Sequence, residues 1–265
     1  MRFHYASIPV AAFTIVMAIS AQAAPVMPSF ANVPTGWSTD RYDPASFSNV
    51  GTYQGRNDVL GIGINATTDS ANRGGQSGTF YNTQGRQHAI TGGAGSSIAA
   101  DLYIPSAWRD SSAGLVRSDM WGVMSDAVLA VTAYPIIGFT NYGSGGARYR
   151  VYDGDVAAGW VDSNVAVAFD AWTSFEIEFT GSAFEFLING ALVYTDNTIN
   201  GTTGFSAVIM QAYNFADPAL GTPTPTTVPY VAHWANAASV PEPGSLVLAG
   251  LALGGLALVR RRRIG

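Results

Sequence analysis

The chain contains no cysteine and no lysine, and only 12% of its 265 residues are charged. Without cysteine it has no disulfide, no thiol nucleophile and no thiolate zinc or iron–sulfur site. Without lysine it has no Walker loop, no Schiff base and no Ser–Lys dyad. Arginine therefore provides the strongly basic side chains. Without disulfides, the folded part must be stabilised by its core alone.

Signature motifs of other enzyme classes are also missing. There is no HExxH and no GxSxG, so a hydrolase triad would need His88 or His233 without any supporting motif. The segment "GIGINA" at 61–66 matches GxGxxA, but no helical pattern follows to hold a phosphate at a helix N-terminus. We therefore expect no organic cofactor.

Positive charge is scarce away from the ends of the chain. Five of the 13 basic residues are Arg2 and Arg260 to Arg263. Residues 24–241 hold eight arginines against 17 aspartates and glutamates, a net charge of −9. This acidic balance argues against nucleic acid as a partner.

The N-terminus has the pattern of a secretory signal peptide. Arg2 precedes an apolar stretch at 8–19, and Ala21 and Ala23 supply the small-x-small pattern that signal peptidase reads. We predict cleavage after Ala23, so that 1–23 is the signal peptide and the mature chain begins outside the cytoplasm.

The stretch from 24 to 239 shows apolar alternation at period two and no long helical period, which predicts one all-β domain. Residues 65–95 should be mainly loops around a short strand at 78–86, and a long loop should separate the last two strands. The other expected strands lie at 58–64, 97–105, 135–142, 147–153, 172–195 as a three-strand meander, 205–213 and 231–237.

The meander carries a resemblance. Its pattern W-x-x-F-x-I-x-F followed by F-x-F-x-I-N-G-x-L-V, within 172–195, is similar to the central strands of concanavalin A-like and laminin-G-like domains. The resemblance implies an antiparallel two-sheet jelly-roll sandwich.

One strand and the loop after it offer candidate ligand-binding residues. Arg148, Arg150 and Tyr152 share a strand face, and Trp160 follows soon after. Flat apolar rings with fixed donors are what a sugar or an acidic polymer requires. An ordinary outer face, in which arginine stems cover apolar surface, is the alternative.

Calcium is the one metal ion that the sequence leaves open. Asp153, Asp155, Asp162 and Asn164 could supply oxygen ligands, but the spacing of a full calcium loop is absent, and turn-forming aspartates explain them equally. We therefore assign no metal ligand.

Two glutamates suggest glycoside hydrolysis as an alternative function. Glu176 and Glu178 point to the same face, and "EIEFTG" resembles the first half of the E-x-D-x-x-E strand of jelly-roll glucanases. Gly181 stands where those enzymes have their last glutamate. We therefore expect no catalytic residue, and a non-enzymatic structural or adhesive protein that is a candidate for carbohydrate binding.

The C-terminus, residues 240–265, has its own signature. Its apolar run at 246–259 would reach roughly 21 Å as a helix, short of the ~30 Å hydrocarbon layer. The motif Pro241, Glu242 and Pro243, this run, and then Arg260, Arg261, Arg262 and Arg263 resemble the PEP-CTERM sorting signal of Gram-negative bacteria. A plain tail anchor is the alternative.

The resemblance implies a route and its partners. Signal peptidase and exosortase would process the chain, and the inner membrane would hold the precursor transiently after export. The mature form would lie at the cell surface or outside the cell, where extracellular polysaccharide is a candidate partner.

Overall fold

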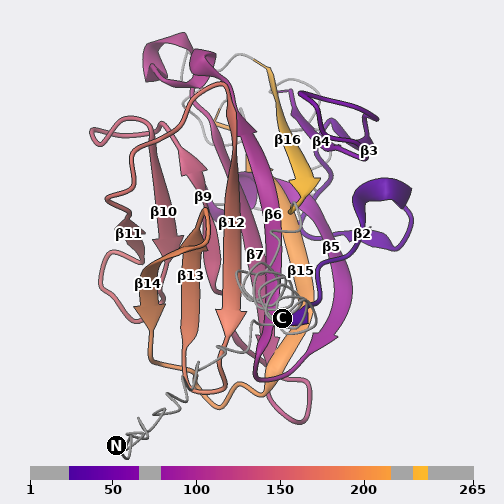
Figure 1. Cartoon of the computed structure of the whole chain (residues 1–265), viewed down its shortest axis with the longest axis vertical. Helices are drawn as coiled ribbons and strands as arrows, with labels where there is room; N and C mark the ends of the chain where they lie inside the picture. The colour runs from indigo at the N-terminus through magenta and orange to yellow at the C-terminus, as the bar shows by residue number, and fades with distance from the viewer. Residues whose placement is uncertain (1–23, 66–78, 216–228, 238–265) are drawn as a thin grey trace, which may run out of the picture. The chain divides into compact units, whose positions relative to one another are not determined.

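The computed structural model describes residues 24–65, 79–215 and 229–237. The described chain is mainly β-strand, with four short 3-10 turns (Figure 1). The turns are η1 (Phe30–Asn32), η3 (Thr79–Asn82), η4 (Ser106–Trp108) and η5 (Ser111–Ala113). The strands are β1 (Ala24–Pro25), β2 (Trp37–Thr39), β3 (Ser46–Asn49), β4 (Leu60–Ile64), β5 (Thr83–Gly92), β6 (Ser96–Ile104), β7 (Arg117–Ser125), β8 (Val131–Ala133), β9 (Ile136–Thr140), β10 (Arg148–Tyr152), β11 (Trp160–Asp162), β12 (Ala171–Phe179), β13 (Phe184–Ile188), β14 (Ala191–Asp196), β15 (Gly204–Tyr213) and β16 (Tyr230–Asn236).

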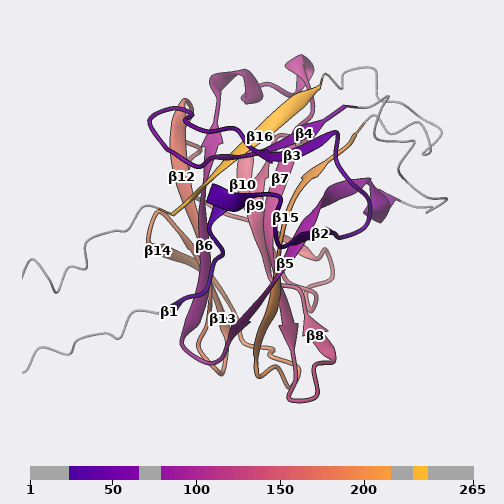
Figure 2. The ribbon, with the colours of Figure 1, turned by 90° about the vertical axis from the view of Figure 1, so that its right-hand side faces the viewer.

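The strands form two packed sheets, which Figure 2 shows from the side. The first sheet has the order β14-β13-β12-β6-β16-β4-β3, with β1 beside β6. The second has the order β11-β10-β9-β7-β15-β5-β2, with β8 beside β7. The short β1–β6 pair is parallel, and the other named pairs are antiparallel. The predicted fold, an antiparallel two-sheet jelly-roll sandwich, is confirmed.

Alternation along the strands places the core between the sheets. On β12, Phe175, Ile177 and Phe179 are at most 1% exposed, while the residues between them are half-buried on the outer face. The predicted meander is confirmed as β12, β13 and β14. Asn189 and Gly190 make its tight turn, both at positive φ, which these two residue types adopt at little cost.

Two side chains from β16 reach across the core and join the sheets by hydrogen bonds. Trp234 is fully buried, and its Nε1 donates to Ser118 Oγ on β7 at 2.9 Å. The Tyr230 hydroxyl lies 2.9 Å from the Arg117 carbonyl and accepts from the Tyr213 amide at 3.0 Å. Burial raises the pKa of the Tyr230 hydroxyl well above its usual range.

The second sheet departs from the sequence prediction at β7 and β5, and its short strands β2, β8 and β11 were not expected either. No strand was expected at 117–125, yet β7 lies at the centre of this sheet, between β9 and β15. Nearly all of β7 is buried, so its residues lack the polar–apolar alternation of a strand with one solvated face. The strand expected at 78–86 is instead η3 followed by β5, which extends to Gly92.

Candidate functional site

A row of polar residues crosses the outer face of the second sheet. Cross-strand pairing aligns Arg150 with Gly138, Gly138 with Asp119, Asp119 with Gln211, and Gln211 with Gly85. Directly opposed residues of an antiparallel pair point to the same face. Asp119 therefore lies between Gly138 and Gln211, with Arg150 beyond Gly138 and Gly85 beyond Gln211.

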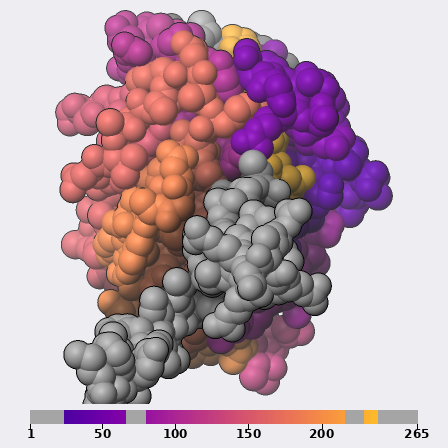
Figure 3. All heavy atoms as spheres, viewed as in Figure 1, coloured from indigo at the N-terminus to yellow at the C-terminus, as the bar shows by residue number. Residues whose placement is uncertain are grey.

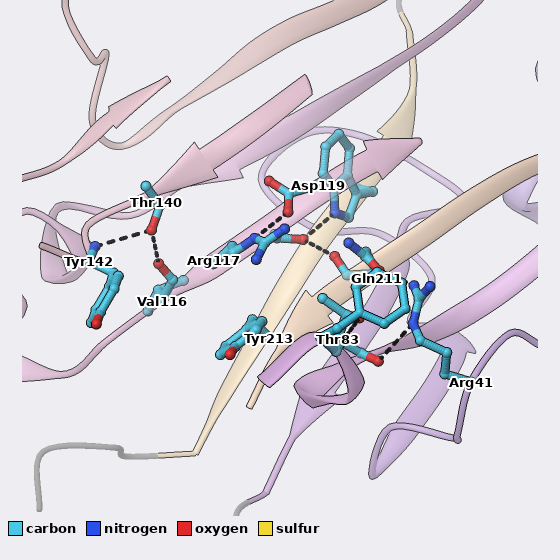
Figure 4. A network of polar contacts seen from close by, with 12 residues as sticks. Arg41, Thr83, Val116, Arg117, Asp119, Thr140, Tyr142, Gln211 and Tyr213 are labelled. Carbon is cyan, nitrogen blue, oxygen red and sulfur yellow. Dashed lines mark hydrogen bonds and ion pairs between the residues drawn. The ribbon is translucent and has the colours of Figure 1, made fainter. Parts of the chain in front are cut away.

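Arginines connect this row to its neighbours (Figure 4). Arg117 Nε donates to Asp119 Oδ2 at 2.5 Å. Arg41, which follows β2, donates from Nη2 to Gln211 Oε1 at 2.7 Å and forms an ion pair with Asp40. Two carboxylates, Asp119 and Asp40, are thus held by guanidinium groups on one face.

Aromatic rings surround the polar row. The Arg41 guanidinium lies 4.7 Å from the ring centres of both Trp121 and Phe80. Phe80, Tyr134 and Tyr142 expose 55%, 44% and 52% of their surface, in contrast to the buried polar row. We call the outer face of the second sheet that these groups share the arginine–aromatic face.

Trp160 on β11 packs against two of the arginines of this face. Its ring centre lies 3.7 Å from the Arg150 guanidinium carbon and 4.7 Å from that of Arg117. Tyr152 packs against the same ring, with centroids 5.2 Å apart. Three of the four predicted ligand-binding residues, Arg150, Tyr152 and Trp160, therefore lie together.

Arg148, the fourth, is occupied in shaping the β9–β10 connection. It donates to Asp162 Oδ1 at 2.7 Å and to the carbonyls of Tyr142 and Gly146 at 2.8 Å each. These contacts close the loop between the two strands, which gives Arg148 a structural role.

Several buried polar atoms on this face have no hydrogen-bond partner among the described residues. They are Asp119 Oδ1, Trp121 Nε1, Gln211 Nε2 and Arg150 Nε. An unsatisfied buried polar group costs roughly 1–3 kcal/mol, so a polar partner that reached these four atoms would be bound favourably. These atoms offer both donors and an acceptor.

Burial changes the acid–base properties of two groups here. It raises the pKa of Asp40 above its usual value, an effect that the ion pair with Arg41 opposes. It lowers the pKa of Arg150 to about 10, against the attraction of Asp119. Burial thus opposes the charged form of both groups.

The sequence analysis missed Asp119, Trp121, Gln211, Arg41 and Asp40 as site residues. Three of them lie on the central strands β7 and β15, and register alone brings them beside Arg150. The pattern Arg117-x-Asp119-x-Trp121, with polar and aromatic side chains on one strand face, was the available signal.

The glutamates of the hydrolase alternative lie on the outer face of the first sheet. This face is toward the viewer in Figure 3, where β13 and β14 are orange. Glu178 is directly opposite Glu185, and its pKa is raised by burial and then by the charges of Glu185 and Glu176. The other cross-strand neighbours of Glu176 and Glu178 are Ala99, Ser97 and Leu187. The aromatic rings of this face, Trp172 and Tyr103, lie four residues further along the same two strands.

The aspartates considered for calcium are divided between two places. Asp153 and Asp155 meet Asp196, with carboxylate oxygens within 4.8 Å of one another, whereas Asp162 pairs with Arg148. Tyr194 donates to Asp153 Oδ2 at 2.7 Å, which raises the pKa of Tyr194 to about 12. Burial, and then the charges of Asp153 and Asp155, raise the pKa of Asp196.

We expect Asp196→Asn to stabilise the protein without added metal. The amide oxygen can still accept from the Thr198 amide, a 2.7 Å bond in the wild type, while the repelling charge is removed. Because a raised carboxyl pKa makes the folded state bind the extra proton, wild-type stability should increase as the pH falls through that pKa. The variant should lack this increase and melt a few degrees higher near neutral pH, at ~2–4 °C per kcal/mol.

Thermal melts from pH 4 to 8, with and without calcium, check this expectation. A lower melting temperature for the variant in chelator would contradict the repulsion. If calcium raises the wild-type melting temperature above that of Asp196→Asn, the three carboxylates hold the ion.

The comparisons with known proteins give one result for the C-terminal end of the chain and another for the β-sandwich. Residues 239–263 match the PEP-CTERM protein-sorting motif. The motif implies export and membrane-associated sorting in a Gram-negative bacterium, with exosortase as the processing enzyme. A comparison with curated proteins finds no match.

The β-sandwich is similar to solved glycoside hydrolase structures. A β-glucanase from Bacillus licheniformis is 16% identical with a TM-score of 0.44, over 77% of this chain and 93% of that one. A family 16 endo-glucanase from Bacteroides ovatus is 14% identical with a TM-score of 0.44, over 78% and 97%. A β-1,3-glucanase from Mycobacterium marinum is 18% identical with a TM-score of 0.41, over 78% and 93%. At these identities, what the chain shares with them is the fold.

The prediction of a non-enzymatic structural or adhesive protein is corrected by this finding. The solved structures that share this fold include glucanases and a transglycosylase, so the fold gives no support to the expectation that the chain is a structural or adhesive protein and not an enzyme.

The predicted processing residues lie outside the described residues. These are Ala21 and Ala23 at the N-terminal end, and the Pro-Glu-Pro motif, the apolar run and the arginine cluster at the C-terminal end. Among the residues that the structure describes, no helix has the length and apolar character needed to cross a membrane.

Proposed function

We propose that the exported domain is a glycoside hydrolase that binds an extended glycan along the arginine–aromatic face. The observation that carries this proposal is the coincidence, on one sheet face, of exposed aromatic rings and buried polar atoms without partners. Sugar rings stack their apolar faces on aromatic side chains, while their hydroxyl groups need donors and acceptors fixed in place.

The dimensions of the face suit a polymer rather than a single sugar. The polar row runs from Arg150 on β10 to Gly85 on β5, across four strand spacings. At ~4.8 Å per spacing, this is roughly 19 Å, long enough for several sugar units. Two exposed rings provide stacking surface near these strands. Phe80 packs beside Trp121 of β7, and Tyr142 packs beside Phe215, which follows β15.

Two carboxyl groups of the face suit the two roles that glycoside hydrolysis requires. Asp40, whose pKa is raised by burial, is the proposed proton donor to the leaving oxygen. Asp119, held by Arg117, is the proposed base or nucleophile. Gln211 pairs with Asp119 across the strands, and Arg41 contacts both Gln211 and Asp40.

The direct test is turnover on a panel of neutral and acidic polysaccharides. The purified full-length protein in detergent should release new reducing ends from at least one of them, and Asp119→Asn should not. Binding of a polysaccharide that Trp121→Ala weakens, without any release of reducing ends, would contradict the hydrolase. No binding to any member of the panel would contradict the whole proposal.

The sorting signal suggests where this activity takes place. In the proposed route, signal peptidase cuts after Ala23 and exosortase cuts near Pro241 to Pro243, after a stage in which the apolar run tethers the precursor. The mature enzyme would then act at the cell surface or outside the cell, on extracellular polysaccharide.

Intact mass and cell fractionation test this route. In a host with exosortase, the extracellular form should have lost 1–23 and the segment after the Pro-Glu-Pro motif. In a host that lacks exosortase, the precursor should stay in the membrane fraction with its C-terminus intact. An extracellular form that retains the arginine cluster would contradict the route.

A further inference from the structure

We infer that the glycan bound by the arginine–aromatic face carries an acidic group, which pairs with Arg150. This inference extends the proposed function, because it names the class of glycan that the same face takes. The shared chemistry is an anion attached to a sugar, either a carboxylate or a sulfate ester.

The first argument is the charge balance of the face. Its four arginines are Arg41, Arg117, Arg148 and Arg150, and its three aspartates each pair with one of the first three. Arg150 forms no hydrogen bond and no ion pair among the described residues. The face therefore carries one unneutralised cation, although residues 24–241 are acidic as a whole.

The second argument is the burial of that cation. Arg150 is only 7% exposed, and its Nε is a buried donor without a partner. Taking a guanidinium group out of water is costly unless an anion or several acceptors replace the water. Stacking on Trp160 at 3.7 Å offsets part of this cost, but a ring face satisfies none of the in-plane N–H groups.

The third argument is the surroundings of Arg150. In the polar row, Gly138 separates Arg150 from Asp119. The rings of Trp160 and Tyr152 lie beside Arg150. A methyl group at Gly138 would lie 2.5 Å from Asp119 Oδ1, so no other side chain can fill this position. A planar guanidinium group next to flat aromatic surface matches an anionic sugar, whose ring stacks while its acid accepts paired N–H bonds.

Binding to three probes tests the inference with full-length protein in detergent micelles. The probes are oligomers of a polyuronic acid, of a sulfated galactan and of a neutral β-glucan. An acidic oligomer should bind at least tenfold more tightly than the neutral one, and its affinity should fall with added salt. The acidic probe that binds more tightly identifies the anion.

Arg150→Gln should weaken binding of the preferred acidic oligomer by roughly 10–150-fold, as expected for loss of hydrogen bonds to a charged group. Binding of the neutral oligomer should weaken much less, because that oligomer has no anion whose pairing with Arg150 is lost. Arg109→Gln is the matched control, because the Arg109 guanidinium also covers a ring, that of Phe169 at 4.6 Å, but is exposed and outside the face. Arg109→Gln should change neither affinity.

Stability without ligand separates binding from a structural role. Removing an unpaired buried cation should leave the melting temperature of Arg150→Gln equal to or above that of the wild type. A clear decrease would overturn the inference, because Arg150 would then have a stabilising role within the fold. Tight binding of the neutral oligomer with no preference for either acid would overturn the inference and leave the proposed function standing. No binding of any probe would contradict both.

Discussion

Asp119→Asn should abolish glycan cleavage while leaving glycan binding largely intact. The amide has nearly the shape of the carboxylate, but it can neither accept a proton nor stabilise a developing positive charge. Loss of such a group typically costs 10²–10⁴-fold in rate. The measurement is the rate of release of reducing ends from the best polysaccharide, together with the dissociation constant of an oligomer too short to be cleaved.

The control for this prediction is Glu178→Gln on the opposite face of the sandwich. Glu178 has a raised pKa and carboxylate neighbours, so it is the strongest competing candidate in the described chain. Its variant should cleave at the wild-type rate. Loss of activity in Glu178→Gln, with an active Asp119→Asn, would move the catalytic site to the first sheet.

Folding of the Asp119 variant must be measured alongside its activity. Asp119 is fully buried and paired with Arg117, so the amide leaves a guanidinium group without its counter-ion. We expect a lower melting temperature but a cooperative transition. If the assay temperature lies well below that transition, a lost rate reports chemistry rather than unfolding.

Trp234→Ala should cause the largest loss of stability of any change proposed for this protein. The indole is fully buried between the sheets, 5.9 Å from the Phe175 ring, and its N–H joins β16 to β7. Truncation of a buried tryptophan costs about 3–5 kcal/mol. At ~2–4 °C per kcal/mol for a domain of this size, the melting temperature should fall by roughly 6–20 °C.

Trp172→Ala is the matched control for Trp234→Ala. Trp172 lies on the outer face of the first sheet, where it is half-buried and donates to the Gln54 carbonyl at 2.9 Å. Its loss should lower the melting temperature by much less. Chemical denaturation of both variants should show the same order, and equal losses would contradict the view that the core between the sheets carries the stability.

Strands with one solvated face were predictable, and strands covered on both faces were not. β12 alternates glutamates with phenylalanine and isoleucine, and β6 places Ile98, Ala100, Leu102 and Ile104 in the core, so the sequence predicted both. β7 carries Asp119 and Trp121 on a face that is itself buried, so its pattern contains no solvent-facing signal. Polar–apolar alternation appears in a sequence only where one face of a strand contacts water, and β7 has little such contact.

The sequence predicted only the part of the candidate site whose residues are near one another in the chain. Arg150, Tyr152 and Trp160 are near one another in the sequence, and β10 with β11 brings them together locally. Asp119, Gln211 and Arg41 come from β7, from β15 and from the segment after β2, at separations of 31 to 109 residues from Arg150. Only strand order and register place them on one face.

The sequence by itself determined the C-terminal sorting motif, the all-β class and the central meander, because each depends on residues that are close together in the chain. The match of residues 239–263 to the sorting motif and the pairing of β12, β13 and β14 confirm two of these. Only the tertiary structure brought the residues of the candidate site together on one sheet face. A buried row made of one residue from each of several strands has no signature along the chain, since antiparallel pairing joins residues by register and not by distance in sequence.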